Sequence, residues 1–232
     1  MASFFPVEAD DPPIQLERAD SIHTTGNQVW NAARVLHRCL ATLPADSEFA
    51  VLRRRGARIL ELGAGIGWLA CAIALHDGVT VCATDQHAQL ALLARNVALN
   101  APQWQRAGSQ VAVEQLDFFD EHTTAQLAHS VATWSLVVAS DVVYTLALAN
   151  AFARTVARIL DTDSAAMLYA HTFGRFTDVD QVLIEQLQAN GVVVGLLVDG
   201  KEEALSTQWV AGEFELFADQ ITRVLILRRA AR

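Results

Sequence analysis

Residues of the metal-binding and disulfide-forming types are scarce in this chain. Its 232 residues include three cysteines, Cys39, Cys71 and Cys82, and no C-x-x-C pair. None of the seven histidines forms an H-x-x-H or H-E-x-x-H pattern, so no metal site is predicted. Cys71 and Cys82 lie in apolar segments and are expected to be buried thiols. Free thiols indicate a reducing compartment, and we expect a cytoplasmic or nuclear protein.

Long apolar runs and an excess of positive charge are missing as well. No apolar run approaches the roughly 18 residues that a membrane span requires, and residues 1–20 lack the basic and apolar regions of a signal peptide. The 26 acidic and 17 basic residues give a net charge of −9, which disfavours nucleic acid as a partner. An acidic surface suits a basic partner, such as a lysine-bearing protein segment, or serves solubility alone. No exposed apolar stripe is evident, so a monomer is expected.

The chain does contain a regular alternation of elements. Strand-like segments are predicted at 57–62, 79–84, 110–116, 134–139, 165–171, 192–198 and 221–227. Helix-like segments are predicted between them at 66–75, 88–99, 123–131, 146–160 and 179–190. Strands that alternate with helices of about 10 to 15 residues indicate βαβ units and a parallel sheet.

We therefore predict an α/β fold, a Rossmann-like doubly wound sheet of seven strands that occupies a domain over residues 56–232. The connection 199–220 is polar and has no clear helical stripe, which allows the last strand to enter antiparallel to its neighbours. The sequence Asn100-Ala101-Pro102 predicts the end of a helix. Residues 1–55 are expected to form an N-terminal extension that packs on the core and contains one amphipathic helix over 28–40.

A glycine-rich segment, Glu61-Leu62-Gly63-Ala64-Gly65-Ile66-Gly67, follows the first predicted strand and opens a helix. Glycines let the backbone turn tightly and let a ligand approach main-chain N–H groups at a strand end where open α/β sheets bind ligands. The spacing G-x-G-x-G differs from the dinucleotide pattern G-x-G-x-x-G, and the following Trp68 disfavours a diphosphate. Glu61 suits the cationic end of a ligand. Alternatively, the glycines serve strand–helix packing alone.

Acidic residues end the next two predicted strands. Asp85 can accept hydrogen bonds from both hydroxyls of a ribose, or it caps the helix that follows. At Asp117-Phe118 the carboxylate can accept a hydrogen bond from an adenine amino group while the ring packs against the base. Asp117 is alternatively an ordinary loop residue.

The fourth predicted strand ends in Ser140-Asp141-Val142-Val143-Tyr144. Asp141 and Tyr144 are three positions apart in a turn and can point into one pocket. An aspartate there attracts an ammonium group, and a tyrosine supplies a hydroxyl and an apolar wall. A helix-capping aspartate and a packed tyrosine are the alternative. His171 ends the fifth strand and could reach the site, although a packed or solvated histidine is the simpler interpretation.

Together these segments resemble the class I (seven-β-strand) methyltransferases, and more narrowly methyltransferase family 16, the protein-lysine methyltransferase group. The similarity runs from about residue 26 to about residue 190, and the combination of motifs is more specific than the glycine motif alone. Two departures are Phe118, where many members carry tryptophan, and the stretch 171–175. The matching stretches are GNQVWNAA (26–33), ILELGAGIG (59–67), ATD (83–85) with LARNVALN (93–100), and ASDVVY (139–144).

The resemblance implies S-adenosylmethionine as cofactor and a protein lysine as target. Asp141 and Tyr144 would orient that lysine, whose nitrogen takes the sulfonium methyl in an in-line displacement. The amine must be neutral, although the pKa of an exposed lysine is about 10.4. Burial lowers that pKa and an ionised Asp141 raises it, so Asp141 is assigned to positioning. The cofactor contacts that the resemblance implies are Trp30, Glu61, Gly63, Gly65, Asp85, Asp117, Phe118 and Ala139.

Other functions compete with this interpretation. A small-molecule N- or O-methyltransferase shares the fold, and a non-catalytic module could retain the cofactor pocket. The Trp30 segment and the D-x-x-Y motif favour a protein substrate. The spacing of the glycines in residues 63–67 disfavours an NAD-dependent oxidoreductase. The sequence contains no G-x-S-x-G motif, which argues against a hydrolase.

Overall fold

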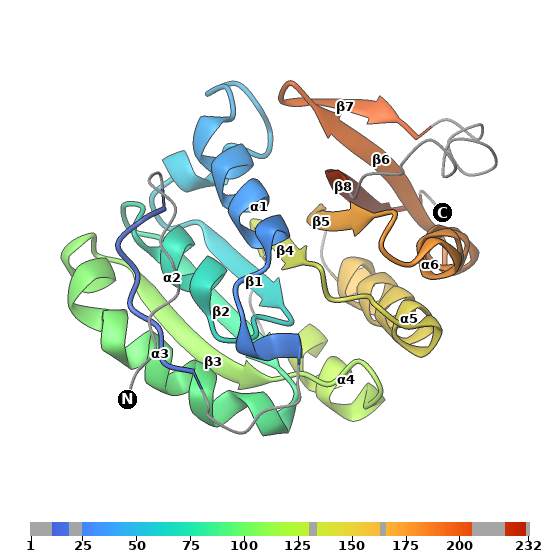
Figure 1. Cartoon of the computed structure of the whole chain (residues 1–232). Helices are drawn as coiled ribbons and strands as arrows, with labels where there is room; N and C mark the ends of the chain where they lie inside the picture. The colour runs from blue at the N-terminus through green and yellow to red at the C-terminus, as the bar shows by residue number, and fades with distance from the viewer. Residues whose placement is uncertain (1–10, 19–24, 130–133, 163–165, 206–220, 231–232) are drawn as a thin grey trace.

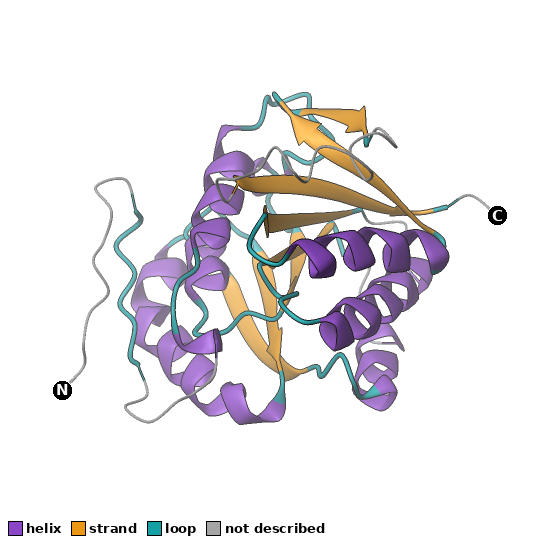
Figure 2. Cartoon of the chain, turned by 45° about the vertical axis from the view of Figure 1, so that its right-hand side comes forward, coloured by secondary structure: helices purple, strands orange, loops and turns teal. Residues whose placement is uncertain are grey.

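The chain forms one mixed sheet between two layers of helices. A computed structural model describes residues 11–18, 25–129, 134–162, 166–205 and 221–230. In this part the sheet has eight strands in the order β3-β2-β1-β4-β5-β8-β6-β7, and helices cover both faces (Figure 1; Figure 2). The strands are β1 (Arg58–Leu62), β2 (Thr80–Asp85), β3 (Gln110–Gln115), β4 (Leu136–Ser140), β5 (Met167–Phe173), β6 (Val192–Val198), β7 (Lys201–Ala204) and β8 (Ile221–Arg229). The helices are α1 (Asn31–Thr42), α2 (Trp68–Ala74), α3 (His87–Arg106), α4 (Glu121–His129), α5 (Leu146–Thr162) and α6 (Thr177–Ala189).

The order of the strands places a ligand crevice beside β1. Strand β1 pairs in parallel with β2 on one side and with β4 on the other. The chain runs outward from β1 to β3, then returns to the centre at β4 and runs outward the other way. This reversal is the topological switch point at which open α/β sheets bind ligands. The predicted doubly wound fold and its antiparallel final strand are confirmed, since β8 runs antiparallel to β5 and β6.

Alternating strand residues divide the core between the two faces of the sheet. Ile59 of β1 packs with residues of α1, α2 and α3, whereas its neighbour Leu60 packs with residues of α5 and α6. Successive side chains of a strand point to opposite faces, which produces this division. The first four residues of β4 are buried and the last is half-buried, as expected for a strand that is covered on both faces.

The sheet has eight strands and not the predicted seven. The additional strand, β7, pairs antiparallel with β6 in the register Val198↔Lys201. Its sequence, KEEA, is mostly charged and carries no apolar alternation, so the sequence pattern does not indicate a strand there. The strand forms because Asp199 and Gly200 both have positive φ, 49° and 78°, as a tight two-residue hairpin turn requires. Residues 206–220 of that connection lie outside the described part.

Helix α3 extends past the predicted stop at residues 100–102. Pro102 lies inside the helix, where the missing N–H and the ring cost about 3 kcal/mol. Tertiary contacts of the last turns offset this cost, because Trp104 is buried and the side chains of Asn100 and Gln103 bond to the N-terminal segment. Among the described helices, none is long and apolar enough to cross a membrane.

An extended N-terminal segment, residues 11–18, lies along α3. The side-chain amide of Asn100 accepts from the N–H of Gln15 and donates to its carbonyl oxygen, at 2.9 and 2.7 Å. Asn96 makes the same pair of bonds with Glu17, at 2.6 and 3.2 Å. The side chains of two asparagines one helical turn apart thus make the hydrogen bonds that a neighbouring strand would make to the backbone of this segment.

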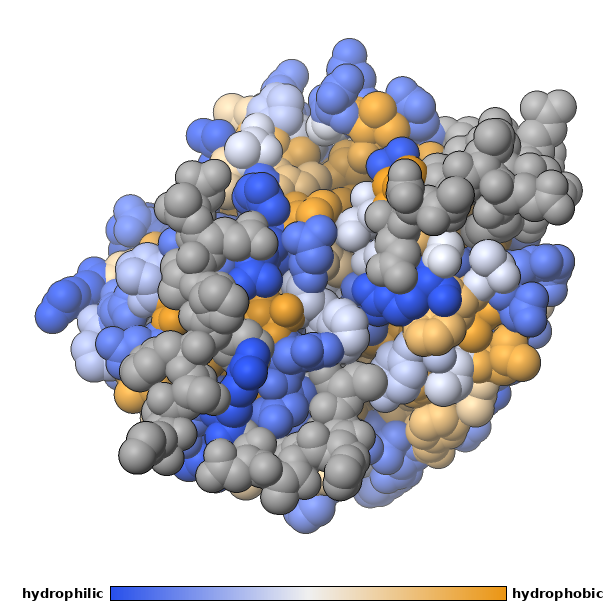
Figure 3. All heavy atoms as spheres, viewed as in Figure 1, coloured by the Kyte–Doolittle hydropathy of each residue, from blue (hydrophilic) through white to orange (hydrophobic). Residues whose placement is uncertain are grey.

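Helix α1 follows and packs its apolar face on the sheet. Ala32, Leu36 and Leu40 are buried there in the same cluster as strand residues. The division of the chain between residues 55 and 56 stays a prediction. On the face shown in Figure 3, hydrophobic surface is visible over α5 and α6 and also between α1 and β6, with hydrophilic residues among these patches.

Candidate active site

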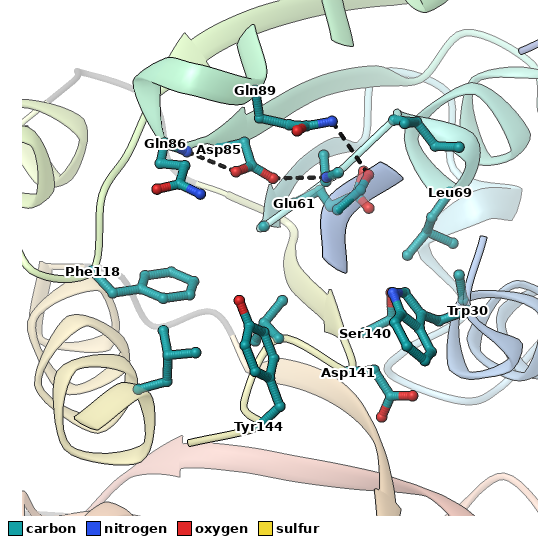
Figure 4. A pocket seen from close by; sticks show the side chains of 18 of the residues that line it. Trp30, Glu61, Leu69, Asp85, Gln86, Gln89, Phe118, Ser140, Asp141 and Tyr144 are labelled. Atoms are coloured by element: carbon teal, nitrogen blue, oxygen red, sulfur yellow. Dashed lines mark hydrogen bonds between the residues drawn. The ribbon is translucent and has the colours of Figure 1, made fainter. Parts of the chain in front are cut away.

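A pocket of about 450 Å³ opens at the carboxyl ends of β1 to β4. Side chains from these strand ends and from the segment before α1 face one another across it (Figure 4). The predicted site residues that line it are Trp30, Glu61, Gly63, Gly65, Asp85, Asp117, Phe118, Asp141 and Tyr144. The structure does not place Ala139 on the pocket wall. Ala139 is fully buried and packs in the core beneath α5, because strand side chains alternate, and the next residue, Ser140, lines the pocket.

The glycine turn after β1 leaves no room for side chains. Gly63 and Gly65 have φ values of 68° and 56°, which favour glycine. A Cβ at Gly65 would lie 2.9 Å from the carbonyl oxygen of Gly26, and one at Gly63 would lie 2.5 Å from Cγ1 of Val142. The turn is thus enclosed by the segment before α1 on one side and the loop after β4 on the other, and its backbone faces the pocket.

Glu61 is a buried carboxyl group with an unsatisfied oxygen atom. Only 2% of the residue is exposed, and Oε2 has no hydrogen-bond partner among the described residues. The pKa of Glu61 is raised to about 8, chiefly by burial and in part by the charge of the nearby Asp85, while a bond from the N–H of Ala70 acts in the opposite direction. A buried acceptor without a partner is costly, and a cationic ligand group in the pocket would satisfy it.

Asp85 ties the end of β2 to the glycine turn. Its Oδ2 accepts a hydrogen bond from the N–H of Gly65 at 2.7 Å, and Oδ1 accepts one from Gln86 at 2.8 Å. Burial raises the pKa of Asp85 to about 6, although these two bonds lower it. Gln89, on the first turn of α3, donates from Nε2 to the carbonyl oxygen of Gly26 at 3.2 Å (Figure 4). The segment before α1, which carries Gly26, is thereby fixed over this side of the pocket.

Asp117 and Phe118 form the next part of the wall. Oδ1 of Asp117 accepts from the N–H of Phe119 at 2.9 Å, which tightens the turn after β3. The Phe118 ring stands edge-on to Phe152, with 5.4 Å between ring centroids, so it is held in place from behind. The pocket therefore has an aromatic ring and a carboxylate side by side, as the recognition of a nucleobase requires.

Asp141 and Tyr144 lie on the opposite side of the pocket. Asp141 is 7% exposed and has a left-handed φ of 48°. Its Oδ1 accepts from the N–H of Thr172 at 2.8 Å, and Oδ2 accepts from the Thr172 hydroxyl at 2.8 Å. The hydroxyl of Tyr144 points into the pocket (Figure 4). The two residues of the D-x-x-Y motif thus share one wall, with the carboxylate held by β5.

Arg175, in the turn between β5 and α6, completes this side of the site. Its Nη2 donates to Oδ2 of Asp141 at 3.1 Å, and its guanidinium carbon lies 4.7 Å from the centroid of the Trp30 ring. Sequence reasoning missed Arg175, Thr172 and Gln89, since none of them belongs to a motif with a mechanical spacing.

His171 is packed and does not line the pocket. It is 2% exposed, with Nδ1 2.9 Å from the hydroxyl of Tyr169 and Nε2 2.7 Å from Oδ1 of Asp180. Oδ2 of Asp180 accepts from the N–H of Gly174 at 2.9 Å. This buried row supports the turn that carries Arg175.

The acceptor and aromatic groups of the pocket suit a nucleoside that carries a cationic group. Glu61 offers an unpaired acceptor, Asp85 a carboxylate at the glycine turn, and Phe118 an aromatic surface, all within one pocket. Among the described residues no group of three or more His, Cys, Asp or Glu side chains could hold a metal ion.

Comparison with known families agrees with this chemistry. A family model described as "Lysine methyltransferase" matches residues 8–190. The chain belongs to the lysine methyltransferase family. This confirms the resemblance drawn from the Trp30 segment, the glycine motif and the D-x-x-Y motif, all of which fall within the matched residues.

Two relatives and one solved structure add detail. Methyltransferase-like protein 22 of Mus musculus is 29% identical over 162 residues, 63% of this chain and 38% of the relative. Protein N-lysine methyltransferase METTL21A of Danio rerio is 29% identical over 144 residues, 60% of this chain and 58% of the relative. The matches thus span less than two thirds of either relative. The crystal structure of the [4+2]-cyclase SpnF is similar with a TM-score of 0.53 and 15% identity, over 90% of this chain and 86% of that one, which shows the fold alone.

Proposed function

We propose that this protein transfers a methyl group from S-adenosylmethionine to a lysine side chain of a protein substrate. The observation that carries the proposal is the unpaired, buried Oε2 of Glu61 beside the glycine turn. Such an acceptor is explained by a ligand with an ammonium group. Membership of the lysine methyltransferase family supports the target, as does the printed name of the METTL21A relative.

The residues of the pocket divide into two groups on this proposal. Bound S-adenosylmethionine supplies an activated methyl group on a sulfonium. Glu61 and the glycine turn bind its methionine part, Asp85 accepts from the ribose hydroxyls, and Phe118 packs against the adenine. Since the leaving group is already activated, the protein contributes mainly by positioning the two reactants.

The second group receives the target lysine. Tyr144 directs its hydroxyl into the pocket and provides an apolar wall for the lysine stem. Asp141 orients the nitrogen from a carboxylate that β5 holds in a fixed position. The displacement would form a bond between that nitrogen and the methyl carbon while the bond from this carbon to sulfur breaks. S-adenosylhomocysteine would leave, and the methylated ammonium would then release a proton to solvent.

We further propose that the protein works as a monomer in the cytoplasm or nucleus, with a protein partner and without nucleic acid or membrane. Three free thiols, Cys39, Cys71 and Cys82, support a reducing compartment. The net charge of −9 supports a basic substrate segment and argues against a nucleic-acid partner.

The direct test is transfer of label from methyl-labelled S-adenosylmethionine to a hypomethylated cell extract. We expect label in one or a few protein bands, located on lysine by mass spectrometry. Asp141→Ala should abolish the labelling and leave the affinity for S-adenosylhomocysteine within about threefold, a change of less than 1 kcal/mol. The matched control is Asp46→Ala, which removes an exposed carboxylate from the turn after α1.

Each other outcome has a definite meaning. Label in small molecules only would replace the protein substrate by a small one. Cofactor binding without any label would favour a non-catalytic module. Absence of cofactor binding would refute the proposal, and equal loss of binding and labelling in Asp141→Ala would move Asp141 to the cofactor site.

A further inference from the structure

Arg175 connects the two groups of pocket residues. It donates to the carboxylate of Asp141 at 3.1 Å and lies over the ring of Trp30 at 4.7 Å. The Asp141 side chain is 2% exposed and that of Arg175 is 22% exposed, so the pair is largely shielded from water. The arginine thus joins the end of β5 to the end of β4 and to the segment before α1.

The proposed reaction creates an electrostatic conflict at this position. An ionised carboxylate beside a lysine amine stabilises the ammonium form and raises its pKa, whereas methyl transfer needs the neutral amine. An arginine remains protonated under all ordinary conditions. Placed on the same carboxylate, it cancels the charge that would hold the lysine as an ammonium and repels an ammonium directly.

Resting on the proposed function, we infer that Arg175 is a positioning residue that neutralises Asp141, so that the target amine enters the site in its reactive, uncharged form. Asp141 then acts as an oriented hydrogen-bond acceptor and not as a net negative charge. The stacking on Trp30 sets the direction from which the guanidinium approaches the carboxylate.

Several other titratable groups surround the pair, and all but Arg223 remain in place in the variants proposed below. Burial and the charge of Asp141 raise the pKa of Tyr169 well above its ordinary value, which keeps this phenol neutral. Across the pocket, the pKa values of about 8 for Glu61 and about 6 for Asp85 belong to the cofactor side. Further groups are Tyr144 and Asp117 on the pocket wall, His171 on β5 with Asp180 on α6, and Arg223 at the β8 position that pairs with His171.

The test is the pH dependence of single-turnover labelling of the protein band found above, from about pH 6 to about pH 10, with cofactor saturating. The rising limb reports the pKa of the bound amine. Arg175→Gln should move this limb to higher pH by about one unit or more, since an uncompensated charge within about 4 to 6 Å has that effect. Arg175→Lys keeps the charge and should leave the limb at its wild-type position.

Two further variants make the result decisive. Arg223→Gln, which removes the same charge from an exposed position on β8, should leave the limb unchanged. Asp141→Asn, which leaves Arg175 unopposed, should lower the overall rate and move the limb to lower pH. Affinity for S-adenosylhomocysteine, measured by calorimetry, should stay within about threefold in Arg175→Gln.

An unmoved limb in Arg175→Gln, or an equal shift in Arg175→Lys, would overturn the inference. If Arg175→Gln fails to fold, the direction of the limb in Asp141→Asn decides, and no downward shift would overturn it. These failures differ from failure of the proposed function, in which the wild-type protein labels no protein band at all.

Discussion

Glu61 is a carboxyl group buried inside the protein in a site where an ordinary core would place an apolar or amide residue. Its pKa of about 8 lies above the ordinary value of 4.5, so the free protein favours its protonated form at neutral pH. A group whose pKa is raised by folding contributes stability that is present below its unfolded pKa and lost as the pH rises through its folded pKa. The free protein should therefore lose stability between about pH 4.5 and pH 8 on account of this residue.

The first prediction at this scale is that Glu61→Gln stabilises the free protein above pH 8 but weakens cofactor binding. Loss of a charged hydrogen bond to the ligand ammonium should reduce the affinity for S-adenosylhomocysteine at least about tenfold, or roughly 1.5–3 kcal/mol. Wild-type affinity should rise as the pH approaches 8, and the variant should keep only the weaker dependence near pH 6 that comes from Asp85. Calorimetry and thermal unfolding across this range measure both effects. Equal affinity of variant and wild type at pH 8 would remove Glu61 from the cofactor site.

Single residues of the site could be predicted where a motif fixes their place on a strand end. Glu61 lies near the end of a predicted strand, and Asp85 and Asp141 come within two residues after one, so the carboxyl edge of the sheet brings them together. Arg175 could not be predicted this way, because its reach to Asp141 depends on how the turn after β5 folds. Ala139 packs in the core while its neighbour Ser140 lines the pocket, since the face to which a strand residue points changes with each position.

At the scale of elements, the asparagines of α3 bind the extended N-terminal segment as a sheet edge would. Asn96 and Asn100 are both fully buried or nearly so and each makes a pair of bonds with that segment. Asn96 also donates to the carbonyl oxygen of Ile66 at 2.9 Å, which ties the segment to the end of the glycine turn. The helix thus couples residues 11–18 to the cofactor side of the pocket.

We predict that Asn96→Ala or Asn100→Ala destabilises the protein by about 1–3 kcal/mol, because two part-buried hydrogen bonds to the segment are lost with each buried amide. Hydrogen exchange should show residues 12–18 losing protection before the sheet does. Urea unfolding gives the free energy, and Gln105→Ala, at an exposed position of the same helix, is the matched control. A stability loss no larger than that of the control would contradict this account of the segment.

Element boundaries that were predicted from the sequence failed where local and tertiary effects disagree. Pro102 predicted a helix end, and the burial of Trp104 together with the bonds of Gln103 extended the helix beyond it. Strand β7 was missed because its residues are charged, although Asp199-Gly200 is a recognised hairpin signal. The core strands β1, β2 and β4 were predicted to within two residues because apolar runs covered on both faces leave few alternatives.

At the scale of the whole molecule, the two edges of the sheet carry polar side chains. Edge strand β3 exposes Gln110, Glu114 and Gln115, and β7 exposes Lys201, Glu202 and Glu203. Charged and short edge strands oppose pairing with a second sheet. The large hydrophobic side chains that are exposed in the described part are few, namely Leu99, Phe119, Leu146, Phe176, Val193 and Val198.

We therefore predict a monomer at micromolar concentrations, with a mass of 25.2 kDa by size-exclusion chromatography and light scattering. The net charge of −9 adds repulsion between copies, so the mass should stay constant when salt is lowered. A mass that rises with protein concentration would show that one of these edges or apolar positions forms an interface.

The contact between Gly63 and Val142 has a consequence for how this scaffold can acquire new substrates. A methyl group at position 63 would lie 2.5 Å from Val142, so on the proposed function the donor turn and the acceptor loop share one wall. A larger side chain at position 142 is expected to press on the donor turn as well as on the acceptor. We therefore expect substitutions that change the acceptor alone to occur at pocket positions outside the glycine turn, such as Thr145 and Leu148.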